Sequence, residues 1–154
     1  MHTTISDPRV WQRWNGAQRV ALVATFEDSA TGTRVRGFVQ ELASQLGRHC
    51  QIIEHIWLLS TLRSRELQEI AAEEAAAADL IVVSFHEAES LPDEVKGWIE
   101  LWLQQRGIRK AVLLALLDSA YQQAPGAIEA YLREVARQGD MEFLVGSETG
   151  FEPR

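Results

Sequence analysis

Unbroken runs of apolar residues alternate along the chain with segments in which apolar residues recur every three or four positions. The unbroken runs predict strands that are buried on both faces, because a strand with one wet face would alternate apolar and polar residues. One of these strands, the second, is expected nearer a sheet edge, since Glu54 and His55 interrupt it. The expected strands are Arg19–Phe26, Gln51–Leu59, Leu80–Val83, Lys110–Leu117 and Met141–Val145.

The periodic segments predict amphipathic helices. In one of them, Val95, Trp98, Ile99 and Trp102 fall on a single helical face, and Ser90 and Asp93 upstream have capping-box spacing. A loop, Glu27–Thr33, is expected before another helix that ends at Gly47. The expected helices are Asp7–Trp14, a segment running from Val35 to Leu46, Ser64–Ala78, a segment running from Asp93 to Leu103, and Ala127–Gln138.

Strands and helices alternate with short connections, which predicts an α/β doubly wound parallel sheet with helices on both faces. Five strands fit the order 2-1-3-4-5, one of the two common solutions. The chain then divides into an amino-terminal helical extension (1–17), one α/β domain (18–146) and a tail (147–154). In such a sheet, ligands bind beyond the carboxyl ends of the strands, so the candidate site residues are sought there.

Composition narrows the function classes. The net charge of −7 argues against nucleic acid or an anionic membrane as partner, and leaves a basic protein partner open. A single cysteine excludes an intrachain disulfide and indicates a reducing compartment. Since neither a signal peptide nor a membrane-spanning run is visible, a cytoplasmic protein is expected. The four histidines and the cysteine have no metal-ligand spacing, so no metal site is expected.

The stretch Val112–Leu144 resembles the part of the flavodoxin family that contains a strand, a Gly-Asp-Ser-x-Tyr loop, a helix and the last strand. Asp118, Ser119 and Tyr121 match that loop, while Leu117 stands where the family has Gly. The segment SLPDEVKGWIELWL is similar to the small FMN reductases, and ALVATF is similar to the first flavodoxin strand. The resemblance covers about residues 19–145 and implies a flavodoxin-like fold with FMN as cofactor.

In that family the loop after the first strand wraps the FMN phosphate with a Ser/Thr-x-Thr-Gly-x-Thr pattern, at a helix amino terminus that favours anions. An alignment of Ser29–Arg34 with this pattern requires an insertion after the first strand, whereas a gapless alignment places Glu27–Gly32 in the phosphate loop. Both alignments remain open. In either register Glu27 and Asp28 would repel the phosphate, and Arg34, which replaces the last Thr, would offset part of that repulsion. The residues that fit the pattern are Ser29, Thr31, Gly32 and Thr33.

The resemblance also implies contacts to the flavin ring. Tyr121 matches the tyrosine that stacks on the ring, and Asp118 matches the residue that hydrogen-bonds its pyrimidine edge. In the loop after the third strand, Phe85 and His86 are the candidates for a second ring contact, and Glu87 stands about where the family has an aromatic residue.

Three functions follow from these observations. The first is an FMN-binding electron carrier or small flavin reductase with a redox partner protein. The alternative is a flavin-free flavodoxin-like module that acts by protein–protein contact or binds another small molecule, as the acids Glu27, Asp28, Glu87 and Glu89 suggest. The third is a hydrolase-like enzyme with His86 as general base. Whether the chain is an enzyme stays open.

The carboxyl-terminal tail, GSETGFEPR, is too short for the helix that covers one sheet face in flavodoxins. Val10, Trp11 and Trp14 of the amino-terminal segment are expected to cover that face instead, in the same chain or in the partner of a homodimer. Removing residues 1–17 should therefore destabilise the domain.

Overall fold

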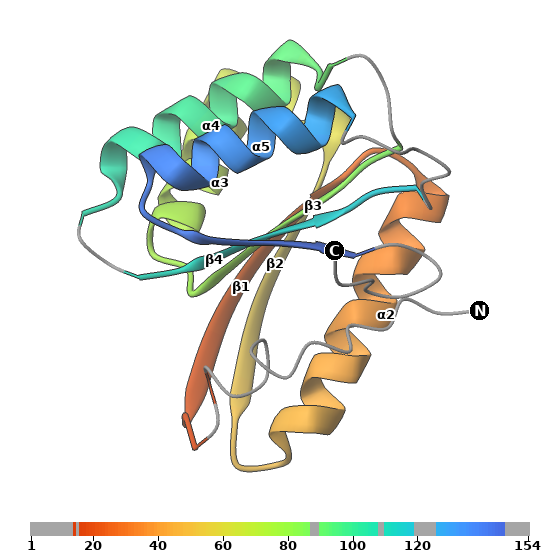
Figure 1. Cartoon of the computed structure of the whole chain (residues 1–154), viewed down its shortest axis with the longest axis vertical. Helices are drawn as coiled ribbons and strands as arrows, with labels where there is room; N and C mark the ends of the chain where they lie inside the picture. Colours follow the sequence, from red (N-terminus) through yellow and green to blue (C-terminus); the bar gives the residue numbers. More distant parts are fainter. Residues whose placement is uncertain (1–13, 15, 87–89, 108–109, 119–125, 147–154) are drawn as a thin grey trace.

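A computed structural model describes residues 14, 16–86, 90–107, 110–118 and 126–146. Its core is a five-stranded, all-parallel sheet with the strand order β2-β1-β3-β4-β5, which confirms the predicted α/β doubly wound, flavodoxin-like fold (Figure 1). The strands are β1 (Arg19–Phe26), β2 (Gln51–Leu58), β3 (Leu80–Ser84), β4 (Val112–Leu116) and β5 (Glu142–Gly146).

The helices divide unevenly between the two sheet faces. α3, α4 and α5 cover one face, and α2 lies on the other (Figure 1). A short 3-10 helix between β2 and α3 was not predicted. The bounds are α2 (Ser29–Leu46), the 3-10 helix η1 (Leu59–Arg63), α3 (Arg65–Ala76), α4 (Asp93–Gln105) and α5 (Ala127–Gln138).

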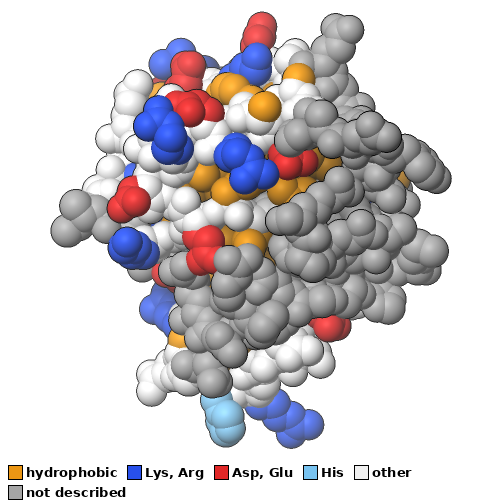
Figure 2. Space-filling model, in the orientation of Figure 1, with side chains coloured by type: hydrophobic (Ala, Val, Ile, Leu, Met, Phe, Trp, Pro, Cys, Tyr) orange, Lys and Arg blue, Asp and Glu red, His pale blue; other side chains and the backbone are white. Residues whose placement is uncertain are grey.

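Burial explains why the apolar runs form strands where they do. Every residue of β3 and β4 is buried, as expected for central parallel strands without alternation. No residue of β2 is fully buried, because β2 is an edge strand, and this confirms the placement suggested by Glu54 and His55. On the visible face of the molecule, acidic and basic side chains are interspersed over α4 and α5 (Figure 2).

The core on the α2 side includes a residue from before β1. Trp14 is only 7% exposed and belongs to the same apolar cluster as Val35, Phe38 and Leu42 of α2. This placement agrees with the expectation that the amino-terminal segment helps to cover this face. Val10 and Trp11 lie outside the described residues.

Two local predictions are wrong. The expected loop Glu27–Thr33 is mostly helix, because Asp28 is the N-cap of α2 and forms a capping box with Thr31. Only two residues, Glu27 and Asp28, therefore separate the end of β1 from the start of α2. The expected capping box of Ser90 and Asp93 does not form either: α4 has Pro92 at its N-cap and no side-chain cap bond. Among the described helices, none has the length and apolar character needed to cross a membrane.

Candidate functional site

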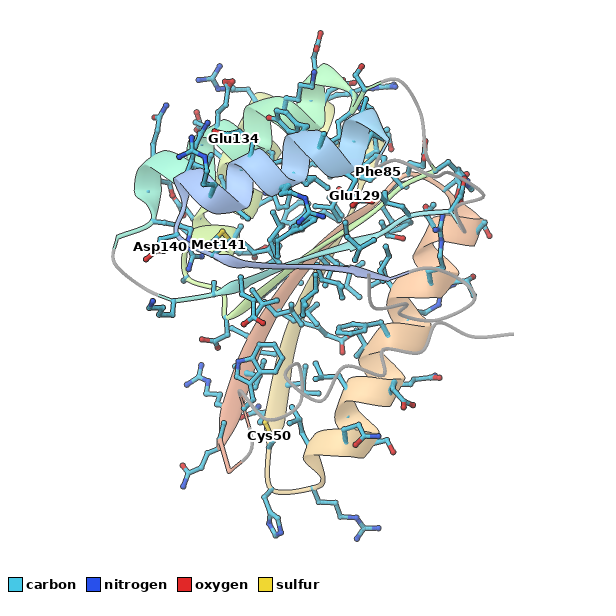
Figure 3. All side chains as sticks on the ribbon, viewed as in Figure 1. Cys50, Phe85, Glu129, Glu134, Asp140 and Met141 are labelled. Carbon is cyan, nitrogen blue, oxygen red and sulfur yellow. The ribbon has the colours of Figure 1, made fainter. Side chains whose placement is uncertain are left out.

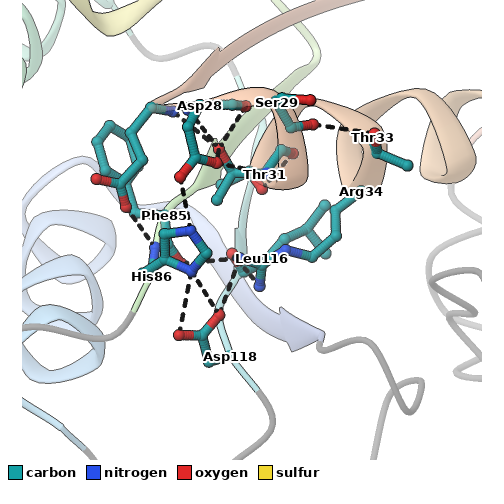
Figure 4. Close-up of polar contacts among 11 residues, drawn as sticks. Asp28, Ser29, Thr31, Thr33, Arg34, Phe85, His86, Leu116 and Asp118 are labelled. Atoms are coloured by element: carbon teal, nitrogen blue, oxygen red, sulfur yellow. Dashed lines mark hydrogen bonds and ion pairs between the residues drawn. The ribbon is translucent and has the colours of Figure 1, made fainter.

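The carboxyl ends of β1, β3 and β4 bring four polar side chains together with one residue of α2 (Figure 4). The strands are aligned so that Phe26 is the register partner of Ser84, and Ser84 that of Leu116. The residues just beyond these ends are therefore neighbours across the sheet edge. We call the group the His86 cluster; its members are Glu27, Asp28, Arg34, His86 and Asp118.

His86 lies at the centre of the cluster and contacts three carboxylates. Its Nε2 atom is 2.8 Å from Asp28 Oδ2, and its Nδ1 atom is 3.0 Å from Asp118 Oδ1. Its backbone N–H donates to Glu27 Oε1 at 2.6 Å. The imidazole ring thus bridges the N-cap of α2 and the end of β4, while the backbone of the same residue binds the end of β1.

The two carboxylates set the charge state of this histidine. The hydrogen bond to Asp118 is the main cause that raises the pKa of His86 above 6.5; partial burial opposes the rise, and the bond to Asp28 adds to it. The pKa of Asp28 is lowered, first by the backbone N–H of Thr31 and also by His86. Each group therefore favours the charged form of the other.

Arg34 is the buried cation of the cluster and pairs with Asp118. Its side chain is only 4% exposed, and it donates to Asp118 Oδ1 at 3.0 Å. The backbone carbonyl oxygens of Phe85 and Leu116 lie 3.5 Å from its guanidinium group. A buried cation needs such acceptors, because an unpaired charge in the interior would be costly. Asp118 consequently serves Arg34 and His86 at once.

The cluster contains three residues that the sequence analysis placed at the phosphate loop but did not count among the cofactor-binding residues: Glu27, Asp28 and Arg34. Arg34 gave a recognisable signal, since it lies four positions before the core residue Phe38 and so shares the inward face of α2. A charged residue on an apolar helix face calls for a buried partner.

The residues expected to wrap a phosphate lie in the first turns of α2. Thr31 is buried, and its hydroxyl accepts from the backbone N–H groups of Glu27 and Asp28 at 3.0 and 2.9 Å. The Thr33 hydroxyl donates to the carbonyl oxygen of Ser29 at 2.9 Å. Ser84 donates to the carbonyl oxygen of Thr31 at 2.9 Å, which ties the end of β3 to the same turn.

Gly32 has a packing role in this turn. A Cβ atom added at Gly32 would lie 3.0 Å from two ring carbons of Phe26. The glycine thus lets α2 approach the aromatic residue at the end of β1. The Thr-Gly pair that matched the phosphate pattern is explained by helix capping and packing.

Of the expected ring contacts, the described residues include three. Phe85 is 1% exposed and belongs to the core under α3, α4 and α5, so its ring is covered by the core (Figure 3). His86 and Asp118 are at the edge, about 40% exposed, but bonded to each other. Ser119 and Tyr121, like Glu87 and Glu89, lie outside the described residues.

In comparisons with known proteins, no family model matches the chain and no curated protein matches it. The fold and the His86 cluster therefore carry the functional argument.

FMN does not fit the described residues in the manner the family uses. The amino terminus of α2, where a phosphate would bind, already holds a carboxylate: Asp28 Oδ1 accepts from the backbone N–H of Thr31 at 2.9 Å. The hydroxyls of Thr31 and Thr33 are bonded within the helix. Glu27 adds a second negative charge beside this end.

The cluster also lacks the arrangement of a general base. A histidine that accepts a proton needs one free ring nitrogen, but both nitrogens of His86 face carboxylate oxygens. Within the described part of the chain, no group of three or more histidine, cysteine or acidic side chains is placed to hold a metal ion. The chemistry that this arrangement supports is electrostatic binding and positioning.

Proposed function

We propose that the chain is a flavin-free module with a flavodoxin-like fold, which binds a positively charged group of a partner at the carboxyl edge of its sheet. The single observation that carries the proposal is the carboxylate of Asp28 bound to the amino terminus of α2. The amino end of α2 lies next to the ends of β1, β3 and β4. It has a capping box, whereas the amino ends of α4 and α5 have no side-chain cap bond. A dianionic phosphate would have to displace this carboxylate.

The charge balance of the cluster supports a cationic ligand. Glu27, Asp28 and Asp118 contribute three negative charges, and Arg34 and protonated His86 contribute two positive charges. Arg34 is buried, whereas Asp28 and Asp118 are 48% and 40% exposed. His86 is 41% exposed, so the part of the cluster that a ligand can reach includes two carboxylates and one imidazole, whose proton offsets only one of the two negative charges. The net charge of −7 on the whole chain adds a long-range attraction for a basic partner.

The competing function is an FMN-binding electron carrier or flavin reductase, and the position of Asp118 beyond the end of β4 favours it. A flavin titration separates the two functions. We expect no saturable binding of FMN or riboflavin to the full chain at high micromolar ligand, measured by quenching of flavin fluorescence. Saturable binding of FMN in the micromolar range would overturn the proposal.

A variant without the charges of Glu27 and Asp28 tests whether these charges prevent the binding of the FMN phosphate. In Glu27→Gln with Asp28→Asn, the helix cap keeps an oxygen acceptor while both charges are lost. We expect this variant to bind FMN measurably at ligand concentrations where wild type shows no saturable binding, and to gain little for riboflavin, which lacks the phosphate. Equal effects on the two ligands would show that these acids do not face the phosphate position.

A matched control separates the local effect from the change in net charge. Glu66→Gln with Glu73→Gln removes two exposed acids from α3, far along the chain from the cluster. It should leave the affinity for FMN unchanged.

If wild type does bind FMN, Tyr121→Ala should weaken binding by about tenfold, because stacking supplies roughly 0.5–1.5 kcal/mol.

A further inference from the structure

We infer that His86 is a proton-controlled clamp, which in its protonated state links the carboxylate of Asp28 at the amino end of α2 to that of Asp118 at the end of β4, and which gives up one of these two links when it loses its proton. This inference rests on the proposed function, since it assigns a control to the same site. It concerns the pH at which the carboxylates of the cluster exchange their bond to His86 for a bond to a ligand.

The geometry around His86 requires a hydrogen-bond donor on each of its two ring nitrogens. Asp28 and Asp118 are carboxylates and act as acceptors, at 2.8 and 3.0 Å from the two ring nitrogens. Only the imidazolium form carries a proton on both nitrogens. A neutral ring would turn one nitrogen lone pair toward a carboxylate, so that bond would be lost and replaced by repulsion. The observed contacts therefore belong to the protonated state.

The charges around the ring favour that state. From the end of β1, Glu27 accepts from the His86 backbone; from the N-cap of α2, Asp28 contacts Nε2; from the end of β4, Asp118 contacts Nδ1. The opposing charge is Arg34, whose guanidinium group donates to the Asp118 oxygen that also contacts His86. Three acids outweigh one base, and the pKa of His86 is accordingly raised, mainly by Asp118.

The clamp joins parts of the chain that are remote in sequence. His86 is separated from Asp28 by 58 residues and from Asp118 by 32. Asp28 is the cap of α2, and Asp118 is the acceptor of the buried Arg34 of the same helix. Loss of the proton breaks the bond of His86 to at least one carboxylate and leaves the cluster with a net charge more negative by one. A cationic ligand should consequently bind better as the pH rises through the pKa of His86.

The effect on stability has a definite sign. A histidine whose pKa is raised by folding stabilises the native state fully below its unfolded pKa of about 6.5 and loses that contribution as the pH rises through its folded pKa. The clamp therefore stabilises the fold fully below about pH 6.5, and this stabilisation is lost as the pH rises from there through the raised pKa of His86. His86→Gln should remove this part of the pH dependence of the unfolding midpoint.

The test is an NMR titration of the full chain without any flavin. We expect the His86 imidazole to titrate above 6.5, and the backbone amides of Thr31 and Leu116 to shift with the same midpoint, because they lie in the two elements that the clamp joins. Asp118→Asn should lower that midpoint more than Asp28→Asn. His86→Gln should abolish the titration of both amides, whereas His49→Gln, at an exposed position after α2, should leave it unchanged.

A His86 midpoint at or below 6.5, or amides of Thr31 and Leu116 that do not follow it, would overturn the inference. The result is separable from the fate of the proposed function. Binding of FMN together with the full titration pattern would defeat only the flavin-free module, and absence of both would defeat only the clamp.

Discussion

At the scale of single residues, Asp28 bonds two different neighbours. Its Oδ1 atom accepts from the backbone N–H of Thr31 at 2.9 Å, and its Oδ2 atom contacts His86 Nε2 at 2.8 Å. The Oδ1 atom caps the first turn of α2, and the Oδ2 atom is part of the His86 cluster. Thr31 completes the arrangement, since its hydroxyl accepts from the backbone N–H of Asp28 at 2.9 Å.

Asp28→Ala should lower the free energy of unfolding by about 1 kcal/mol, the usual cost of removing an N-cap acceptor. Asp28→Asn keeps an oxygen acceptor for the Thr31 N–H and should lose much less. The measurement is the urea midpoint at a pH below 6.5, where His86 is protonated in both variants. Equal losses in the two variants would show that the cap bond does not determine the start of α2.

At the scale of elements, the carboxyl end of α3 is capped by an arginine that follows α4. Arg106, which follows α4 and is 9% exposed, donates to the carbonyl oxygens of Ala75, Ala76 and Ala78 at 3.1, 3.5 and 3.4 Å. The last carbonyls of a helix have no partners within it, and a cation there also suits the helix dipole. The last turn of α3 itself contains no basic residue.

Arg106→Ala should therefore destabilise the fold by about 2 kcal/mol, because buried carbonyls would lose a charged donor. Arg65→Ala is the matched control: this arginine is 77% exposed and pairs with Glu69 across one helical turn. An exposed pair of this kind contributes about 0.5 kcal/mol or less. Thermal melts of both variants test the difference, and similar melting temperatures would contradict a capping role for Arg106.

At the scale of the whole molecule, the two sheet faces are covered by unequal means. One face has three helices, including the edge-to-face pair Trp98 and Trp102, whose ring centroids are 6.0 Å apart. Of the described elements, α2 is the helix on the other face, where Trp14 is also buried. Trp14, which precedes β1, thus belongs to the apolar core on this face.

Deleting residues 1–17 should cause aggregation or a clear loss of stability, since it removes Trp14 from this face. The narrower variant Trp14→Ala should cost about 3 kcal/mol or more, as large-to-small changes of buried tryptophan do, and Trp14→Phe should cost less. Size-exclusion chromatography and thermal melts provide the measurements. A deletion variant with unchanged melting temperature and oligomeric state would contradict this role.

The architecture of the sheet could be predicted from local patterns in the sequence. The unbroken apolar runs of β3 and β4 can only be buried on both sides, and alternation with helices then requires parallel strands. Such patterns are local properties of the chain, so they can be read without coordinates. Even the edge position of β2 was visible in Glu54 and His55.

The contacts of the polar residues at the strand ends could not be predicted from the sequence, because they depend on how distant segments pack together. The Ser29–Thr33 segment fits both a phosphate loop and a helix start, because Asp, Ser, Thr and Gly serve in either. The contact of His86 with Asp28 and Asp118 spans 58 and 32 residues, and no local pattern encodes it. The register of the parallel strands sets which loop residues meet, and that register is fixed by packing over the whole sheet.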